Sequence, residues 1–135
     1  LADAYPNQVA VHIGYDEALA HRLIAAADII LVPSRFEPCG LTQLYGLKYG
    51  TLPLVRKTGG LADTVVNSDN ANIKGKTATG FVFEEASSEA LSEILDQAIG
   101  LWGSRTWSSI RKQAMQQDFG WHIAAENYNS CYHRT

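Results

Sequence analysis

The chain alternates short apolar runs with longer stretches in which apolar residues recur every three or four positions. The short runs predict strands, and the wider spacing predicts helices. Strands are expected at residues 8–13, 28–32, 51–55 and 80–83. Helices are expected at residues 17–27, from 41 to Gly50, at 62–66, from 87 or 88 to Gly100, around 107–114 and at 121–132. This alternation predicts an α/β fold with a parallel sheet and right-handed crossovers.

Local signals refine these elements. Asp16 is a suitable N-cap for the first helix, whose predicted buried stripe is Ala20, Leu23, Ile24 and Ala27. Residues 67–79 are polar and show no period, which predicts a surface loop. Trp107 and Trp121 lie on apolar helix stripes and are expected to pack. We find no internal domain boundary, so residues 1–135 are expected to form a single domain.

Residues 32–43, Val-Pro-Ser-Arg-Phe-Glu-Pro-Cys-Gly-Leu-Thr-Gln, connect a buried strand to the start of a helix through a tight turn. Gly40 allows the backbone to approach a ligand closely. The first N–H groups of a helix that begins near Leu41 carry partial positive charge, which suits a phosphate. Glu37 would repel phosphate, so it is expected to accept hydrogen bonds from neutral hydroxyls. Together these features predict a ligand that carries both phosphate and a polyol such as a sugar.

Three turns follow predicted strands, at residues 14–15, 37–42 and 58–60. The carboxyl ends of parallel strands share one edge of the sheet, and ligands bind outside that edge. We therefore expect the three turns to lie together. Alone, the turn at 58–60 is a weak signal, because many strand-to-helix turns contain glycine.

Composition narrows the function classes. A net charge of -3 gives no electrostatic reason to expect a nucleic-acid partner. No apolar run approaches the roughly 20 residues needed to cross a bilayer, so no membrane contact is expected. Cys39 and Cys131 are too few for a disulfide framework or a zinc site, and a cytoplasmic location is the default expectation. The chain begins at Leu1 without Met, and we expect it to be part of a longer protein.

Residues 13–15, 33–43 and 57–65 resemble bacterial members of the glycogen/starch synthase family, and the resemblance extends over essentially the whole chain. It implies the GT-B fold, with two Rossmann-like halves and an active site between them. This chain would then be most of the C-terminal, nucleotide-sugar-binding half. The Arg and Lys with which the family clamps the donor phosphates lie in opening strands that this sequence does not contain.

The resemblance also implies an activity. The family transfers glucose from ADP-glucose to the non-reducing end of an α-1,4-glucan, with retention at the anomeric carbon and without a metal or other cofactor. The glucan acceptor would be bound mainly by the missing N-terminal half. The chain alone is therefore expected to bind ADP or ADP-glucose and to be inactive as a transferase.

Site residues follow from the same resemblance. Glu37, the catalytic candidate, matches the carboxylate that holds the donor glucose hydroxyls. Tyr15 matches the aromatic residue that packs on adenine, and Gly14 lets that base approach. The remaining donor-binding candidates match two turns and a helix start: Cys39, Gly40, Leu41, Thr42, Thr58, Gly59 and Gly60.

Some alternatives stay open. Many related transferases carry a second Glu eight residues after the first, and Tyr45 occupies that position here. Arg35 could contact a phosphate or a neighbouring carboxylate. Cys39 is expected to pack and not to act as a nucleophile. The rival functions are a GT-B-fold epimerase or phosphorylase relative, the latter with a Lys-bound pyridoxal phosphate, and a non-catalytic Rossmann-like nucleotide-binding module.

Overall fold

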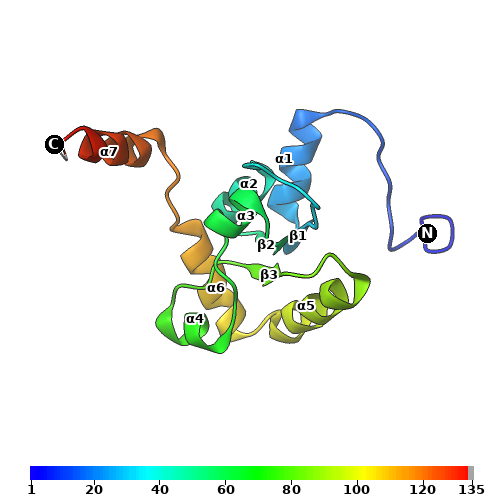
Figure 1. Cartoon of the computed structure of the whole chain (residues 1–135). Coiled ribbons are helices and arrows are strands. Elements are labelled where there is room, and N and C mark those ends of the chain that lie inside the picture. The colour runs from blue at the N-terminus through cyan, green and yellow to red at the C-terminus, as the bar shows by residue number, and fades with distance from the viewer. Residues whose placement is uncertain (134–135) are drawn as a thin grey trace.

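The computed structural model describes residues 1–133, and Figure 1 shows the arrangement of the elements. Its helices and strands, in chain order, are α1 (Glu17–Ala26), β1 (Ile29–Val32), α2 (Thr42–Tyr49), β2 (Leu52–Arg56), α3 (Gly59–Thr64), α4 (Asn70–Gly75), β3 (Phe81–Phe83), α5 (Ser88–Leu101), α6 (Arg105–Met115) and α7 (Trp121–Tyr132).

Within the described residues, three parallel strands form one sheet in the order β1-β2-β3. Leu54 in the central strand is paired with Leu31 on one side and with Phe81 on the other. One helix, α2, lies between β1 and β2, and two helices, α3 and α4, lie between β2 and β3, which gives the crossover connections that parallel pairing requires. The predicted α/β class and parallel sheet are therefore confirmed.

The two faces of β2 enter different parts of the core. Leu52 and Leu54 belong to a cluster with Phe81 of β3 and with residues of α2, α5 and α6, among them Trp107. Val55 points to the other face, where it packs with Leu61 of α3 and with the neighbouring Val65. Because both faces are covered, four of the five β2 residues are buried, which explains the continuous apolar run in the sequence.

Predicted helix ends are confirmed at several points. The Asp16 carboxylate accepts a hydrogen bond of 2.8 Å from the backbone N–H of Leu19 and so caps α1. Gly50 ends α2 in the left-handed conformation, with φ of 79°. The Ser87 hydroxyl, one of two predicted caps for α5, accepts a hydrogen bond from the N–H of Ala90 at 3.2 Å.

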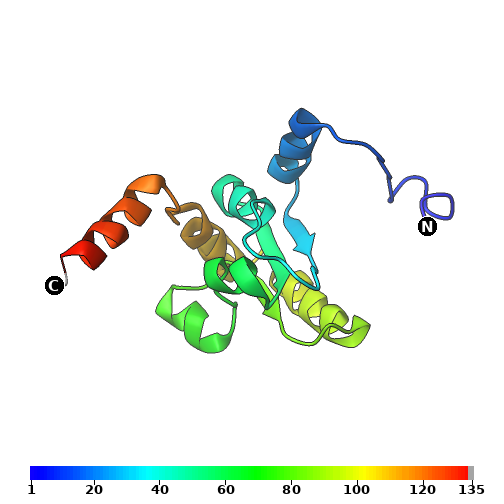
Figure 2. The same ribbon diagram turned by 45° about the horizontal axis from the view of Figure 1, so that its top comes forward.

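The strand predicted at residues 8–13 is wrong for this chain: in the described structure this segment forms no strand, and Ile13 is 93% exposed. Figures 1 and 2 both show the first residues extending away from the sheet. An alternating pattern indicates a surface that fits a sheet, but a strand also needs a neighbour that accepts its backbone hydrogen bonds. Residues 8–13 have no such neighbour here.

Three smaller predictions also need correction. The loop predicted at residues 67–79 contains α4, which Asp69 caps by accepting a 2.8 Å hydrogen bond from the Asn72 N–H. The helix predicted at 62–66 is α3, which begins at Gly59 and ends at Thr64. Of the buried stripe predicted for the first helix only Ile24 is buried, because Ala20, Leu23 and Ala27 are exposed, Leu23 at 58%.

The two tryptophans that were expected to pack differ in burial. Trp107 is buried and stacks near Phe81, as expected. Trp121 is 88% exposed, since α7 lies away from the sheet in both views and none of its residues is buried. Among residues 1–133, no helix combines the length and apolar character needed to span a membrane.

Candidate functional site

The turn between β1 and α2 contains Glu37, which is half-buried. The Ser34 hydroxyl donates to the Glu37 Oε2 atom at 3.4 Å. Glu37 forms no ion pair with any residue in the described part of the chain. Its carboxylate therefore keeps most of its acceptor capacity for a further partner.

The turn ends at Gly40, whose φ of 74° lies in the left-handed region. Leu41 is the N-cap of α2, and no side chain of residues 1–133 caps this helix. The first N–H groups of α2 therefore lack the hydroxyl or carboxylate partner that closes α1. This end of α2 carries the partial positive charge that the sequence predicted.

The turn that follows β2 packs directly against the first turn, backbone to backbone. The N–H of Gly60 lies 3.2 Å from both the Glu37 and the Pro38 carbonyl oxygens. A Cβ atom at Gly59 would lie 2.0 Å from the Glu37 oxygen, and one at Gly60 would lie 2.2 Å from the Cys39 oxygen. Only glycine permits this approach, and we call residues 37–40 and 58–60 the interlocked turns.

Gln43, in the first turn of α2, joins the interlocked turns from within. Its side chain is fully buried, and Nε2 donates to the carbonyls of Cys39 at 2.9 Å and Gly40 at 3.0 Å. Nε2 also lies 3.3 Å from the Thr64 hydroxyl, which donates to the Gly60 carbonyl. The Gln43 Oε1 atom is buried without a partner, an arrangement that costs about 1–3 kcal/mol.

A hollow of about 380 Å³ lies between α1 and α2. We call it the α1–α2 hollow, and its lining residues are Gly14, Tyr15, Asp16, Glu17, Ala20, His21, Ile24, Leu41, Thr42 and Tyr45. Its volume is within the range of small-molecule sites, about 300–1,000 Å³. The rings of His21 and Tyr45 contact each other, with centroids 4.6 Å apart. The hollow therefore combines an aromatic wall with the uncapped start of α2.

The structure thus places the predicted site residues in two adjoining groups. Gly14, Tyr15, Leu41 and Thr42 line the α1–α2 hollow. The interlocked turns contain Glu37, Cys39, Gly40, Thr58, Gly59 and Gly60, and they join the hollow where Gly40 meets Leu41. One interlocked turn follows β1 and the other follows β2, so both lie at the same edge of the sheet, as predicted. The turn at 14–15 follows no strand and reaches the group through the hollow instead.

Other features stay outside this arrangement. A second hollow of about 410 Å³ lies between α2 and residues 115–120, and none of the predicted site residues lines it. Arg35 is exposed, and the structure shows no ion pair for it among residues 1–133, so a carboxylate partner is not found. Its contact with a phosphate stays a prediction. Cys39 is exposed, which contradicts the packing role expected for it.

Two residues were missed by sequence reasoning. Gln43 lies in the segment 32–43, but its sequence position assigns it no role, since a polar residue near a helix start usually faces solvent. Arg56 ends β2 and donates to three backbone carbonyls. No sequence pattern predicts bonds to backbone atoms more than twenty positions away.

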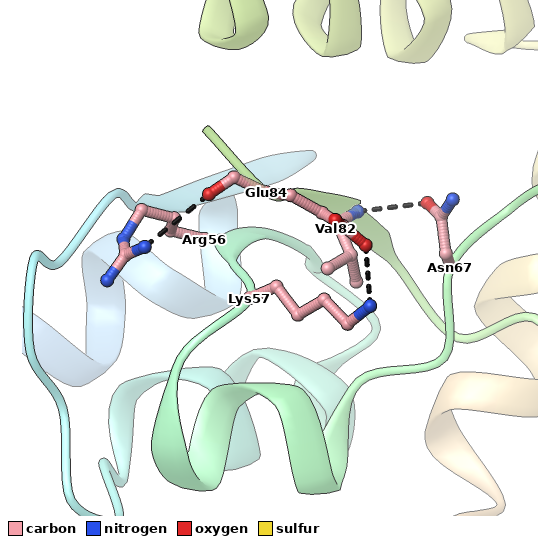
Figure 3. A network of polar contacts seen from close by, with 5 residues as sticks. All are labelled: Arg56, Lys57, Asn67, Val82 and Glu84. Atoms are coloured by element: carbon pink, nitrogen blue, oxygen red, sulfur yellow. Dashed lines mark hydrogen bonds and ion pairs between the residues drawn. The ribbon is translucent and has the colours of Figure 1, made fainter. Parts of the chain in front are cut away.

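Lys57 and Glu84, near the sheet edge, form an exposed ion pair. The Lys57 ammonium lies 2.5 Å from the Glu84 carboxylate, as Figure 3 shows. The hydrogen bond and charge of Lys57 lower the pKa of Glu84 below its ordinary value. Elsewhere, the N–H of Gly120, aided by His122, lowers the pKa of Asp118.

Comparisons with known proteins extend these observations. Residues 1–116 match the family model described as glycosyl transferases group 1. The glycogen synthase of Haemophilus influenzae is 64% identical over 135 residues, which are 99% of this chain and 28% of that protein. This chain therefore spans little more than a quarter of the length of such relatives.

Solved structures agree with the sequence matches. The catalytic domain of starch synthase IV from Arabidopsis thaliana, bound to ADP and acarbose, is 35% identical, with a TM-score of 0.85 over 98% of this chain and 28% of that one. Sucrose-phosphate synthase from Thermosynechococcus elongatus shares the fold, with a TM-score of 0.65, 21% identity and coverage of 97% of this chain and 31% of that one. The Rossmann-like sheet is thus of the GT-B type. The chain belongs to the glycosyl transferases of group 1, and within them it is similar to glycogen and starch synthases.

Proposed function

We propose that this chain, residues 1–135, is most of the C-terminal, donor-binding half of a synthase. The synthase extends an α-1,4-glucan from ADP-glucose with retention at the anomeric carbon. The observation that carries the proposal is the meeting of an uncapped helix start with a half-buried carboxylate at one sheet edge. The similarity to glycogen synthases and to an ADP-bound starch synthase supports the choice of donor.

Each part of the ligand has a suitable partner. The aromatic wall of the α1–α2 hollow suits an adenine, with Tyr15 at 93% exposure free to stack on the base. The N–H groups at the start of α2, near Leu41 and Thr42, suit the diphosphate. Glu37 lies in the turn that precedes the start of α2, where it accepts hydrogen bonds from the glucose hydroxyls.

The chemistry asked of this part is electrostatic. Negative charge grows on the departing ADP as the glycosidic bond to the diphosphate breaks. The N–H groups at the start of α2, which the interlocked turns hold in place, stabilise that charge without moving, so no reorganisation is needed as the bond breaks. Glu37 orients the sugar, and no covalent attack by Cys39 is involved. The acceptor glucan is bound mainly by residues outside this chain, so the chain alone does not polymerise glucose.

Titration of the chain with ADP, with UDP as the control nucleotide, tests the proposal. We expect a preference for ADP and shifts of the Leu41 and Thr42 amide signals in the NMR spectrum. A chain without a donor-nucleotide site gives neither result, and a relative with another donor gives a preference for a different nucleotide. Either of these results would refute the proposed donor.

A further inference from the structure

Arg56 occupies the carboxyl end of the central strand, where its side chain reaches the ends of both neighbouring strands. Its Nε donates to the Ser34 carbonyl at 2.8 Å and a terminal nitrogen donates to the Arg35 carbonyl, both in the segment after β1. The other terminal nitrogen lies 3.4 Å from the carbonyl of Glu84, after β3, as Figure 3 shows. One guanidinium thus connects the chain segments that follow β1 and β3.

These bonds use the shape of the guanidinium more than its charge. Among residues 1–133, Arg56 forms no ion pair, whereas the adjacent Lys57 pairs with the Glu84 carboxylate at 2.5 Å. A guanidinium presents several donors in a fixed planar fork, and a lysine ammonium is a single point on a flexible stem. A lysine at position 56 therefore cannot hold the same carbonyls in the same relative positions.

The segment that Arg56 holds leads directly to Glu37. Ser34 accepts from Arg56 through its carbonyl, and its hydroxyl donates to Glu37 Oε2 at 3.4 Å. The backbone of Glu37 is fixed from the other side, because the N–H of Gly60 lies 3.2 Å from its carbonyl oxygen. Backbone and carboxylate are thus held by two different contacts, and the second depends on Ser34.

The geometry points to Arg56 as a positioning residue for Glu37, acting through the backbone and hydroxyl of Ser34. Its importance for the reaction rests on the proposed function, in which Glu37 orients the donor glucose. Arg56 does not touch the sugar. Without it, the Ser34–Arg35 segment loses two of its bonds to β2, and the Glu37 carboxylate is displaced from the position that the sugar hydroxyls require.

The test uses a full-length synthase that contains this sequence and measures kcat, the KM for ADP-glucose and the thermal midpoint. Displacement of a reacting group by about 1 Å costs up to about 100-fold in rate, so Arg56→Ala is expected to lower kcat about 10- to 100-fold. Arg56→Lys keeps the charge and most of the stem, and it should recover the thermal midpoint more than kcat. Lys57→Ala is the matched control, since it removes the neighbouring charge without touching Ser34, and its kcat should stay within about twofold of the parent.

A double-mutant cycle separates positioning from general support of the fold. In a Glu37→Ala background, Arg56→Ala should have little further effect on kcat, because the group that it positions is already gone. Equal fold-losses in both backgrounds would overturn the inference and leave the proposed function intact. A near-normal kcat for Glu37→Ala alone would instead refute the role of Glu37 in the proposed function. Where Arg56→Ala lowers the yield of folded protein, the same cycle with Arg56→Lys decides the question.

Discussion

Replacement of Gly60 by alanine tests the contact between the interlocked turns. A Cβ atom there would lie 2.2, 2.6 and 2.8 Å from three backbone atoms of Cys39, its oxygen, Cα and carbonyl carbon. Backbone atoms cannot turn aside as the end of a flexible side chain can. The turn at 58–60 would therefore have to move away from residues 37–39 by about 1 Å to reach ordinary van der Waals contact.

The expected destabilisation follows from three contributions. Insertion of an extra carbon into a packed site costs about 1–3 kcal/mol. Loss of the Gly60 N–H bond to the Glu37 and Pro38 carbonyls adds about 0.5–1.5 kcal/mol. Gly60 belongs to α3, and alanine is a better helix former than glycine. The substitution therefore offsets about 0.5–1 kcal/mol of this loss of stability. We therefore expect Gly60→Ala to lower the free energy of unfolding by about 2 kcal/mol.

Urea unfolding followed by tryptophan fluorescence measures this change. Trp107 is 3% exposed and reports the loss of the core, whereas Trp102 and Trp121 are already 60% and 88% exposed. With an m-value of about 1–3 kcal/mol/M, the urea midpoint should fall by about 1 M. Gly100→Ala is the matched control: this glycine lies in α5 with nothing within 4 Å of a Cβ atom, so alanine should raise stability by up to about 1 kcal/mol.

A Gly60→Ala protein as stable as the parent, within about 0.5 kcal/mol, would refute this reasoning. It would mean that the turn at 58–60 does not contact residues 37–39 closely in solution. The interlocked turns could then not hold a ligand site as one rigid unit. Destabilisation by Gly100→Ala of the same size would show that the assay reports helix substitutions in general and not this contact.

Two further outcomes concern single contacts. Ser87→Ala should lower the free energy of unfolding by about 1 kcal/mol, because Ser87 caps α5, while Ser88→Ala, one position inside the helix, should change it little; equal effects in thermal melts would contradict the cap assignment. Lys57 lowers the pKa of Glu84 in the folded state below its ordinary value of 4.5. The ion pair therefore stabilises the folded protein at pH values above 4.5, and this stabilisation is lost as the pH falls through the folded-state pKa. The small stability difference between the parent and Lys57→Ala should therefore vanish in acid and shrink with salt, and a pH-independent difference would disprove this origin.

Much of the fold was predictable because its signals are local. A continuous apolar run is typical of a strand inside a parallel sheet that is covered on both faces. The run that forms β2 is such a strand, and four of its five residues are buried. Asp16, Gly50 and Ser87 act on backbone groups within four residues of themselves, so their roles as helix caps can be recognised in the sequence. The positions of Glu37 and the two glycine turns at one sheet edge follow from strand direction alone.

The tertiary structure decided what depends on distant partners. The stretch at residues 8–13 has the alternation of a strand, yet it forms none here, because a strand exists only where another strand accepts its hydrogen bonds. Arg56 holds the segment after β1 through carbonyls that lie 21 and 22 residues away in the chain. Gln43 adds to its local bonds a contact with Thr64, 21 residues away. Side-chain types and their spacing specify helices, turns and faces, whereas bonds between distant backbone atoms exist only after the sheet has brought its strand ends together.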